Sequence, residues 1–192
     1  MKRYLFNNFS FFIIILYFSL LVGFYLNENS TGGAIKDYFN QKVISINFSN
    51  EFLNTLLNYE KTSTRHSPVL IILFSAFEKY GVNDFIIRLI NLHVCLVLPL
   101  IFFKCLKIKF RNIDEKYLIL FSGLIFLSPT FRSLAIWPDS RIWGLFFFCY
   151  SIYFFLIYKK NKNSNYCFLV VIFYTIASYL SPNFSVFSIF FM

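Results

Sequence analysis

The chain has 192 residues, of which 58% are hydrophobic and 23% aromatic, and its mean hydropathy is +0.62. A soluble domain needs far more polar surface, so the composition excludes that class and predicts an integral membrane protein. The net charge of +9 could indicate nucleic-acid binding, but the basic residues lie in short loops between apolar runs, as in cytoplasmic loops of membrane proteins. We therefore expect no nucleic-acid partner.

The first apolar run, residues 9–26, follows Lys2 and Arg3. A cleaved secretory signal is the alternative. However, a run of about eighteen residues can span a bilayer, and no A-x-A-like cleavage site ends it. The sequence therefore predicts a retained first spanning helix whose N-terminus is cytoplasmic.

Residues 27–84 predict a long outer loop. Within it, EFLNTLLNYE places apolar residues at helical spacing between Glu51 and Glu60, which predicts an amphipathic helix on the membrane surface. A second helix is predicted after Ser67, because Ser67 suits the N-cap, Pro68 the first helical position and Gly81 the residue after the C-cap.

Charge decides whether that second helix crosses the membrane. The helix after Ser67 would be about 20 Å long, whereas the hydrocarbon core of a bilayer is about 30 Å thick. If it does not cross, Lys2 and Arg3, the basic segment 104–116 and the basic segment 159–162 all lie on the cytoplasmic side, as the positive-inside rule requires. We therefore expect an interfacial helix lying parallel to the membrane on the outer face.

Further spanning helices are predicted at 85–103, 117–131, 142–158 and 166–180. The last apolar run, 184–192, is roughly half the length that a bilayer requires, so we expect either a fragment or an interfacial tail. The predicted fold class is an all-α polytopic membrane protein with membrane-parallel helices between its first two spanning helices. Residues 1–192 then form a single, incomplete membrane domain.

Two carboxylates stand out on the predicted outer face. Asp37 follows the Gly32-Gly33 pair, which permits a tight turn that could hold it at the bilayer surface as a general base. Asp139 follows Trp137-Pro138 at the predicted start of a spanning helix. Either acid could instead be an ordinary first-turn residue that complements the helix dipole, which is the commoner case.

Basic residues share that predicted face. Arg65, Arg132 and Arg141 could bind a lipid phosphate bidentately, or they could be snorkelling anchors. Arg88 and Asn91 lie three residues apart within a spanning run, where packing against the outer-loop helices is the simpler explanation.

The cysteines predict neither a disulfide framework nor a metal site, because they lie in or beside apolar segments without CxxC spacing. They are Cys95, Cys105, Cys149 and Cys167. We expect no cofactor, and the sequence leaves a divalent-metal requirement open.

Several stretches resemble the N-terminal part of GT-C superfamily membrane glycosyltransferases, the group that includes bacterial relatives of dolichyl-phosphate-mannose protein mannosyltransferases. They are RHSPVLIILFSAFEKYG with the helix after it, LSPTFRSLAIWPDSRIW, TIASYLSPNFSVF and NSTGGAIKDYF. The sequence departs from the family pattern at Ser67, which replaces a proline, at Ser181-Pro182-Asn183, which lacks the usual lysine, and at Asp37, which stands alone where relatives have an acidic pair.

The resemblance implies an inverting hexosyl- or pentosyltransferase in the bacterial inner membrane. Its donor would be a polyprenyl-phosphate sugar, and its acceptor a lipid, glycan or protein on the outer face. Asp37 would be the general base and Asp139 the second carboxylate, while Arg65, His66 and Arg141 would contact the acceptor or the donor phosphate. The alternatives are a non-catalytic polytopic protein, such as a transporter subunit or assembly factor, and an inactive fragment of such an enzyme. A transporter would show polar residues at mid-membrane in broken helices.

Overall fold

The computed structural model describes residues 2–62, 64 and 67–191, with side chains from Phe11 onward except Phe190. All regular elements within this part of the chain are helices. The all-α prediction is therefore confirmed.

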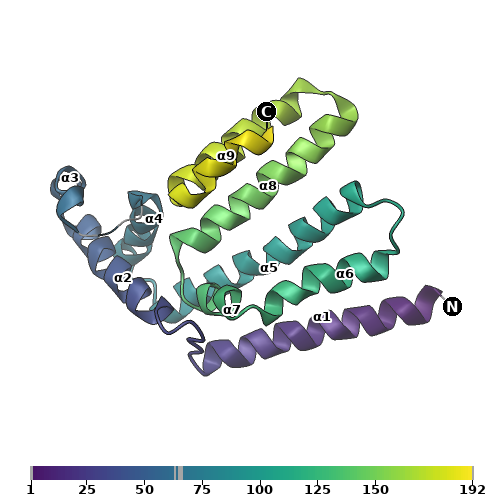
Figure 1. Ribbon diagram of the computed structural model, residues 1–192. Coiled ribbons are helices and arrows are strands. Elements are labelled where there is room, and N and C mark those ends of the chain that lie inside the picture. Colours follow the sequence, from purple (N-terminus) through teal and green to yellow (C-terminus); the bar gives the residue numbers. More distant parts are fainter. Residues whose placement is uncertain (1, 63, 65–66, 192) are drawn as a thin grey trace.

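Helices that run alternately up and down form a bundle (Figure 1). They are α1 (Lys2–Tyr25), α5 (Asp84–Lys109), α6 (Glu115–Gly123), α8 (Ser140–Asn161) and α9 (Ser164–Leu180). Short turns join α5 to α6 and α8 to α9, so the helices of each pair pack as antiparallel neighbours. Helix α5 also packs against α8, which connects the two pairs.

The bundle has two chemically different ends. At one end lie the basic segments 104–116 and 159–162 together with the N-terminal end of α1 (Figure 1), and we call this the basic end. Lys104 Nζ of α5 lies 6.0 Å from the ring centroid of Tyr153 in α8, so α5 and α8 are neighbours near this end. The opposite end, where α5 and α8 begin at Asp84 and Ser140, is called the site end.

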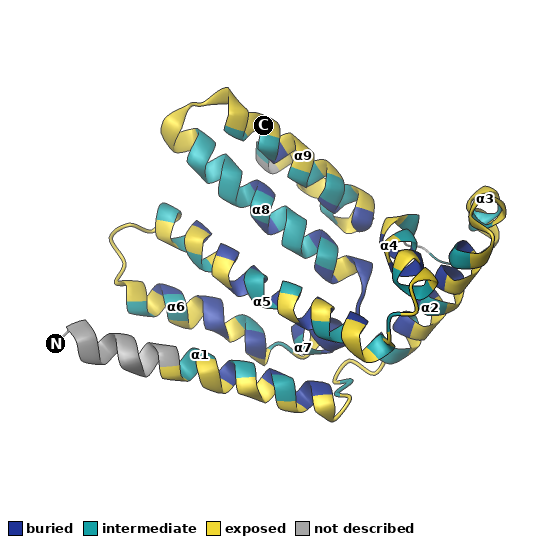
Figure 2. Ribbon diagram, turned by 180° about the vertical axis from the view of Figure 1, so that it is seen from behind, coloured by how far each residue is buried: buried dark blue, intermediate teal, exposed yellow. Residues whose placement is uncertain are grey.

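Two helices, α5 and α8, are long and apolar enough to cross a membrane. Helix α9, with 17 residues, and the Phe11–Tyr25 part of α1 are shorter apolar helices. Large apolar side chains are exposed on the bundle helices, for example Phe11 and Phe18 of α1 and Phe168 of α9. Figure 2 shows exposed positions along both α1 and α9. Such a surface suits hydrocarbon better than water, which supports the prediction of a membrane protein.

The predicted span at 117–131 is not one straight helix. Helix α6 passes into the 3₁₀ turn η2 (Leu124–Leu127), and α7 (Pro129–Ile136) then begins at an angle of 67° to the α6–η2 segment. Pro129 disfavours helical geometry at Ser128, whose side chain instead caps α7 by accepting a hydrogen bond of 3.3 Å from the N–H of Phe131. Together these segments could form a third, bent span.

Residues 34–62 and 67–79 form a helical unit at the site end, which we call the cap (Figure 1). It contains α2 (Ala34–Asn50), α3 (Phe52–Leu57), the 3₁₀ helix η1 (Tyr59–Thr62) and α4 (Pro68–Lys79). Helices α2 and α4 pack together, and α4 is not one of the bundle helices. The predicted amphipathic helix is shorter than expected, because α3 covers only six residues, none of them buried.

The ends of α4 agree with the prediction. Ser67 is the N-cap and Pro68 the first helical residue. Gly81 follows the C-cap residue Tyr80 with φ +67°, a left-handed conformation that favours glycine. Ser67 has the extended backbone of an N-cap residue, but its side chain makes no capping hydrogen bond.

The last apolar run folds back onto the bundle. It forms the 3₁₀ helix η3 (Pro182–Phe191), which packs against α8 and α9. The ring of Phe184 stacks on Phe148 with centroids 5.1 Å apart, and the hydroxyl of Tyr174 donates to the carbonyl oxygens of Phe184 and Ser185. Within the described residues, this segment therefore covers part of α8.

Candidate functional site

Asp139 lies buried at the start of α8. Its side chain is the N-cap, and Oδ1 accepts a hydrogen bond of 2.7 Å from the N–H of Arg141. The side chain is only 2% exposed. A buried carboxylate needs a cation or several donors, and Asp139 has both.

Arg141 joins Asp139 to Asp37. Its Nε lies 2.8 Å from Asp139 Oδ1 and its Nη2 lies 3.0 Å from Asp139 Oδ2, so the pair is bidentate. The same Nη2 donates to Asp37 Oδ2 at 2.8 Å. The structure therefore brings together three of the sequence-predicted site residues, from segments about one hundred positions apart.

Asp37 lies in the first turn of α2, directly after the predicted glycine turn. Gly32 has φ +74°, and Gly33 is the N-cap of α2. The side chains of Asp37 and Arg141 are 41% and 43% exposed, in contrast to that of Asp139. Of the two carboxylates, Asp37 is thus the one that a substrate can reach, and a reachable carboxylate can accept or orient a proton.

Gln41 completes this cluster and was not predicted from the sequence. It lies one turn after Asp37 on α2 and is 3% exposed. Its Nε2 donates to Asp139 Oδ2 at 3.4 Å, while its Oε1 is buried without a partner among the described residues. The i, i+4 spacing from Asp37 was the available signal, because it places both side chains on one face of a helix.

A pocket of about 290 Å³ borders Arg141, and we call it the Arg141 pocket. Its polar lining comes from the start of α7, the C-cap of α9 and the start of η3; these residues are Ser128, Thr130, Ser181 and Asn183. Its apolar lining comes from η2, α7, α8 and η3; these residues are Ile125, Phe131, Leu134, Ile142, Leu145 and Phe184. A mainly apolar cavity with a few convergent polar groups is the usual form of a small-ligand site.

A second polar cluster ties the cap to α5. Lys42 Nζ lies 2.5 Å from Asp84 Oδ1 and 3.8 Å from Glu78 Oε1. The hydroxyl of Tyr38 donates to Asp84 Oδ1 at 3.3 Å. Burial, with the nearby Asp84 charge, raises the pKa of Tyr38 well above its usual range, so this hydroxyl stays protonated and remains a donor.

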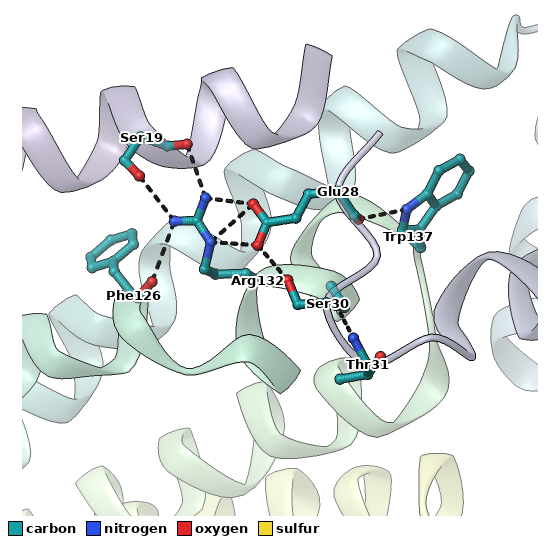
Figure 3. A network of polar contacts seen from close by, with 8 residues as sticks. Ser19, Glu28, Ser30, Thr31, Phe126, Arg132 and Trp137 are labelled. Atoms are coloured by element: carbon teal, nitrogen blue, oxygen red, sulfur yellow. Dashed lines mark hydrogen bonds and ion pairs between the residues drawn. The ribbon is translucent and has the colours of Figure 1, made fainter. Parts of the chain in front are cut away.

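Arg132 belongs to a different network (Figure 3). Its Nε lies 2.7 Å and its Nη2 2.5 Å from the carboxylate of Glu28, and both terminal nitrogens also donate to Ser19. The Arg132 guanidinium, as the main donor, lowers the pKa of Glu28 despite partial burial. Within the described residues, no hydrogen bond or ion pair joins Arg132 to the Asp37–Arg141–Asp139 cluster, so Arg132 is the predicted site residue that lies outside this cluster.

Arg88 and Asn91 support the linker that carries Asp139. Arg88 Nε donates to the carbonyl of Ile136 at 3.2 Å, and its guanidinium carbon lies 3.6 Å from the Trp137 ring centroid. Asn91 Nδ2 donates to the carbonyls of Leu134 and Ala135. These side chains pack against the end of α7, where they satisfy carbonyls that the helix leaves open, and Arg88 Nη1 also donates to Asn27 Oδ1 of the predicted outer loop at 2.9 Å.

Two of the predicted substrate-binding residues, Arg65 and His66, lie outside the described residues. Among the residues that are described, no three His, Cys, Asp or Glu side chains gather in a metal-binding arrangement. Comparison with protein-family models, curated proteins and solved structures gives no match to this chain.

Proposed function

We propose that this chain is part of a membrane glycosyltransferase that moves a sugar from a polyprenyl-phosphate donor to an acceptor at the outer membrane face. The observation that carries the proposal is the Arg141 bridge between a half-exposed carboxylate, Asp37, and a buried one, Asp139. The motif resemblance in the sequence supports the same reading, since it singles out the same two aspartates.

In this proposal Asp37 is the general base. It takes the proton of the acceptor hydroxyl while the acceptor oxygen forms a bond to the anomeric carbon of the donor sugar. The bond from that carbon to the phosphate oxygen breaks on the opposite side, and polyprenyl phosphate leaves with inversion. Arg141 contacts the phosphate, where a guanidinium stabilises the charge that develops on the leaving group.

Asp139 is a positioning residue in this scheme. Because it is buried and bonded to Arg141 and Gln41, it acts through the orientation of the Arg141 guanidinium rather than by touching the substrate. Arg65 and His66, which come just before α4 in the sequence, are proposed as further contacts to the acceptor or the donor phosphate.

The arrangement suits a lipid-linked donor. The cluster lies where α8 begins, and α8 is one of the helices long enough to cross a membrane. The proposed topology puts the basic end in the cytoplasm and the cap on the outer face, so the sugar would meet Asp37 at the membrane surface. The exposed apolar side chains of α3, such as Leu53 and Leu57, would rest in the outer leaflet.

The test is Asp37→Asn in the full-length protein, supplied with a radiolabelled polyprenyl-phosphate sugar in membranes. We expect sugar transfer to be lost while membrane insertion is retained, because asparagine keeps the size of the side chain but cannot take a proton. Glu51→Gln is the matched control, since it also removes one carboxylate from the cap. Transfer that survives in Asp37→Asn would remove Asp37 from the catalytic role.

A further inference from the structure

The two carboxylates that hold Arg141 differ sharply in burial and in the number of bonds that fix them. Asp139 is 2% exposed and accepts from the Arg141 backbone N–H, from both guanidinium nitrogens that face it, and from Gln41. Asp37 is 41% exposed and accepts a single bond from Nη2. The Asp139 contact therefore fixes Arg141, whereas the Asp37 contact is the one that solvent or a ligand can replace.

The guanidinium also has unused capacity. Its Nη1 makes no hydrogen bond or ion pair within the part of the chain that the structure describes, and the side chain is 43% exposed. Arg141 lines the Arg141 pocket, whose other polar groups include Ser128, Ser181 and Asn183. A phosphate in this pocket that accepts from Nη1 and Nη2 together would leave the Nε bond to Asp139 in place, but it would take the position on Nη2 that Asp37 occupies.

We propose that the Arg141 pocket binds a phosphate group, and that this phosphate displaces Asp37 from Arg141. Asp37 is then paired, and unable to act as a base, while the pocket is empty, and it is released when the pocket is filled. This inference rests on the proposed function for the role of the freed carboxylate. The competition between Asp37 and the phosphate is a property of the site itself.

The proposed competition predicts in which direction the affinity for phosphate changes when Asp37 is replaced. Because Asp37 and the phosphate compete for one guanidinium, removing the Asp37 charge must tighten phosphate binding rather than weaken it. Because the exposed ion pair between Asp37 and Arg141 is weak, its loss should lower the Kd for phosphate only about two- to fivefold. Removing Asp139 must act in the opposite direction, because Arg141 then loses the contact that orients it.

The Kd of the full chain in detergent for phosphate ligands is measured by isothermal titration calorimetry, and intrinsic tryptophan fluorescence is the second readout. Both tryptophans lie beside the site, since Trp137 precedes Asp139 and Trp143 follows Arg141. The probes are inorganic phosphate and geranyl phosphate. We expect geranyl phosphate to bind more tightly, because Phe131, Ile142 and Phe184 can take up its chain. Equal affinities would assign the pocket to free phosphate instead.

The variants then decide the proposal. Asp37→Asn should tighten binding two- to fivefold, Asp139→Asn should weaken it, and Arg141→Gln should remove it. Glu51→Gln, which deletes a cap carboxylate that accepts from Asn54 rather than from Arg141, should leave Kd unchanged. The proposal is overturned by unchanged or weaker binding in Asp37→Asn, by binding that persists in Arg141→Gln, or by equal tightening in Glu51→Gln. If Arg141→Gln elutes as an aggregate, Arg141→Lys replaces it, and we expect this variant to bind phosphate more weakly than the wild type.

These results separate the inference from the proposed function. Tighter phosphate binding in Asp37→Asn without any sugar transfer by the wild-type protein would support the competition and contradict the glycosyltransferase. Sugar transfer that depends on Asp37, together with no change in phosphate affinity, would do the reverse.

Discussion

At the scale of single residues, Asp139 combines two roles that substitution can separate. It caps α8, and it fixes the Arg141 guanidinium. Asn is also a good N-cap residue. Asp139→Asn should therefore keep the N-cap hydrogen bond of α8 and weaken the ion pair with Arg141, whereas Asp139→Ala loses both. We expect Asp139→Ala to be less stable than Asp139→Asn by about 1 kcal/mol, measured by thermal unfolding in detergent. Equal stabilities would mean that the capping bond contributes little.

The Glu28–Arg132 pair makes a prediction about pH. Because the pKa of Glu28 is lowered from 4.5 in the folded chain, its ion pair stabilises fully above pH 4.5, and this contribution is lost as the pH falls through the lowered value. The difference in unfolding temperature between wild type and Glu28→Gln should therefore be largest near neutral pH and shrink below pH 4.5. A difference that is constant from pH 7 to pH 3 would contradict the assignment.

Sequence reasoning found some residues of this site and missed others for identifiable reasons. Asp37 and Asp139 were predicted to share one face, and the structure joins them through Arg141. Gln41 was missed because its one signal, the i, i+4 spacing from Asp37, does not show that an uncharged amide is buried beside a carboxylate. The Glu28–Arg132 pair was missed because its partners are 104 positions apart, and only the fold brings them together.

At the scale of elements, Gly144 of α8 lets η3 fold back. A Cβ built on Gly144 would lie 2.9 Å from both Phe184 Cε2 and Ser181 Cβ, so a side chain there forces the turn away. We expect Gly144→Val to cost about 1–3 kcal/mol and to expose η3 to limited proteolysis. Adding Phe184→Ala should restore part of the space and reduce the proteolysis. If the double variant is cleaved as fast as the single one, the contact is not the cause.

The elements differ in how far local sequence determines them. Helix α4 was predicted with its ends, because Ser67, Pro68 and Gly81 each favour one backbone conformation. The bend at Ser128-Pro129 was not predicted as a break in the 117–131 span, because the continuous apolar run was given more weight than the Ser-Pro pair, which disfavours helical geometry before the proline. The fold-back of η3 could not be predicted either, since it depends on space at Gly144 in another helix.

At the scale of the whole molecule, the topology is testable. A reporter fused after Lys109 and one fused after Lys162 should both lie on the same side as the N-terminus, because these positions belong to the basic end. A cysteine placed at Gly33 should be labelled from the opposite side. If the Lys109 fusion lies across the membrane from the N-terminus, the cap and the start of α8 no longer share a compartment in the proposed way.

The long separation between Glu28 and Arg132 also has a consequence for biosynthesis. The ribosome makes 104 further residues after Glu28 before its partner exists, which takes about 5 to 20 s at ordinary translation rates. During that interval the Glu28 carboxylate lacks its guanidinium partner, so it is better accommodated in water than in the bilayer. Release of the polypeptide before Arg132 is translated would leave α1 without the bonds from Arg132 to Ser19, which are among the contacts that hold it to the later helices.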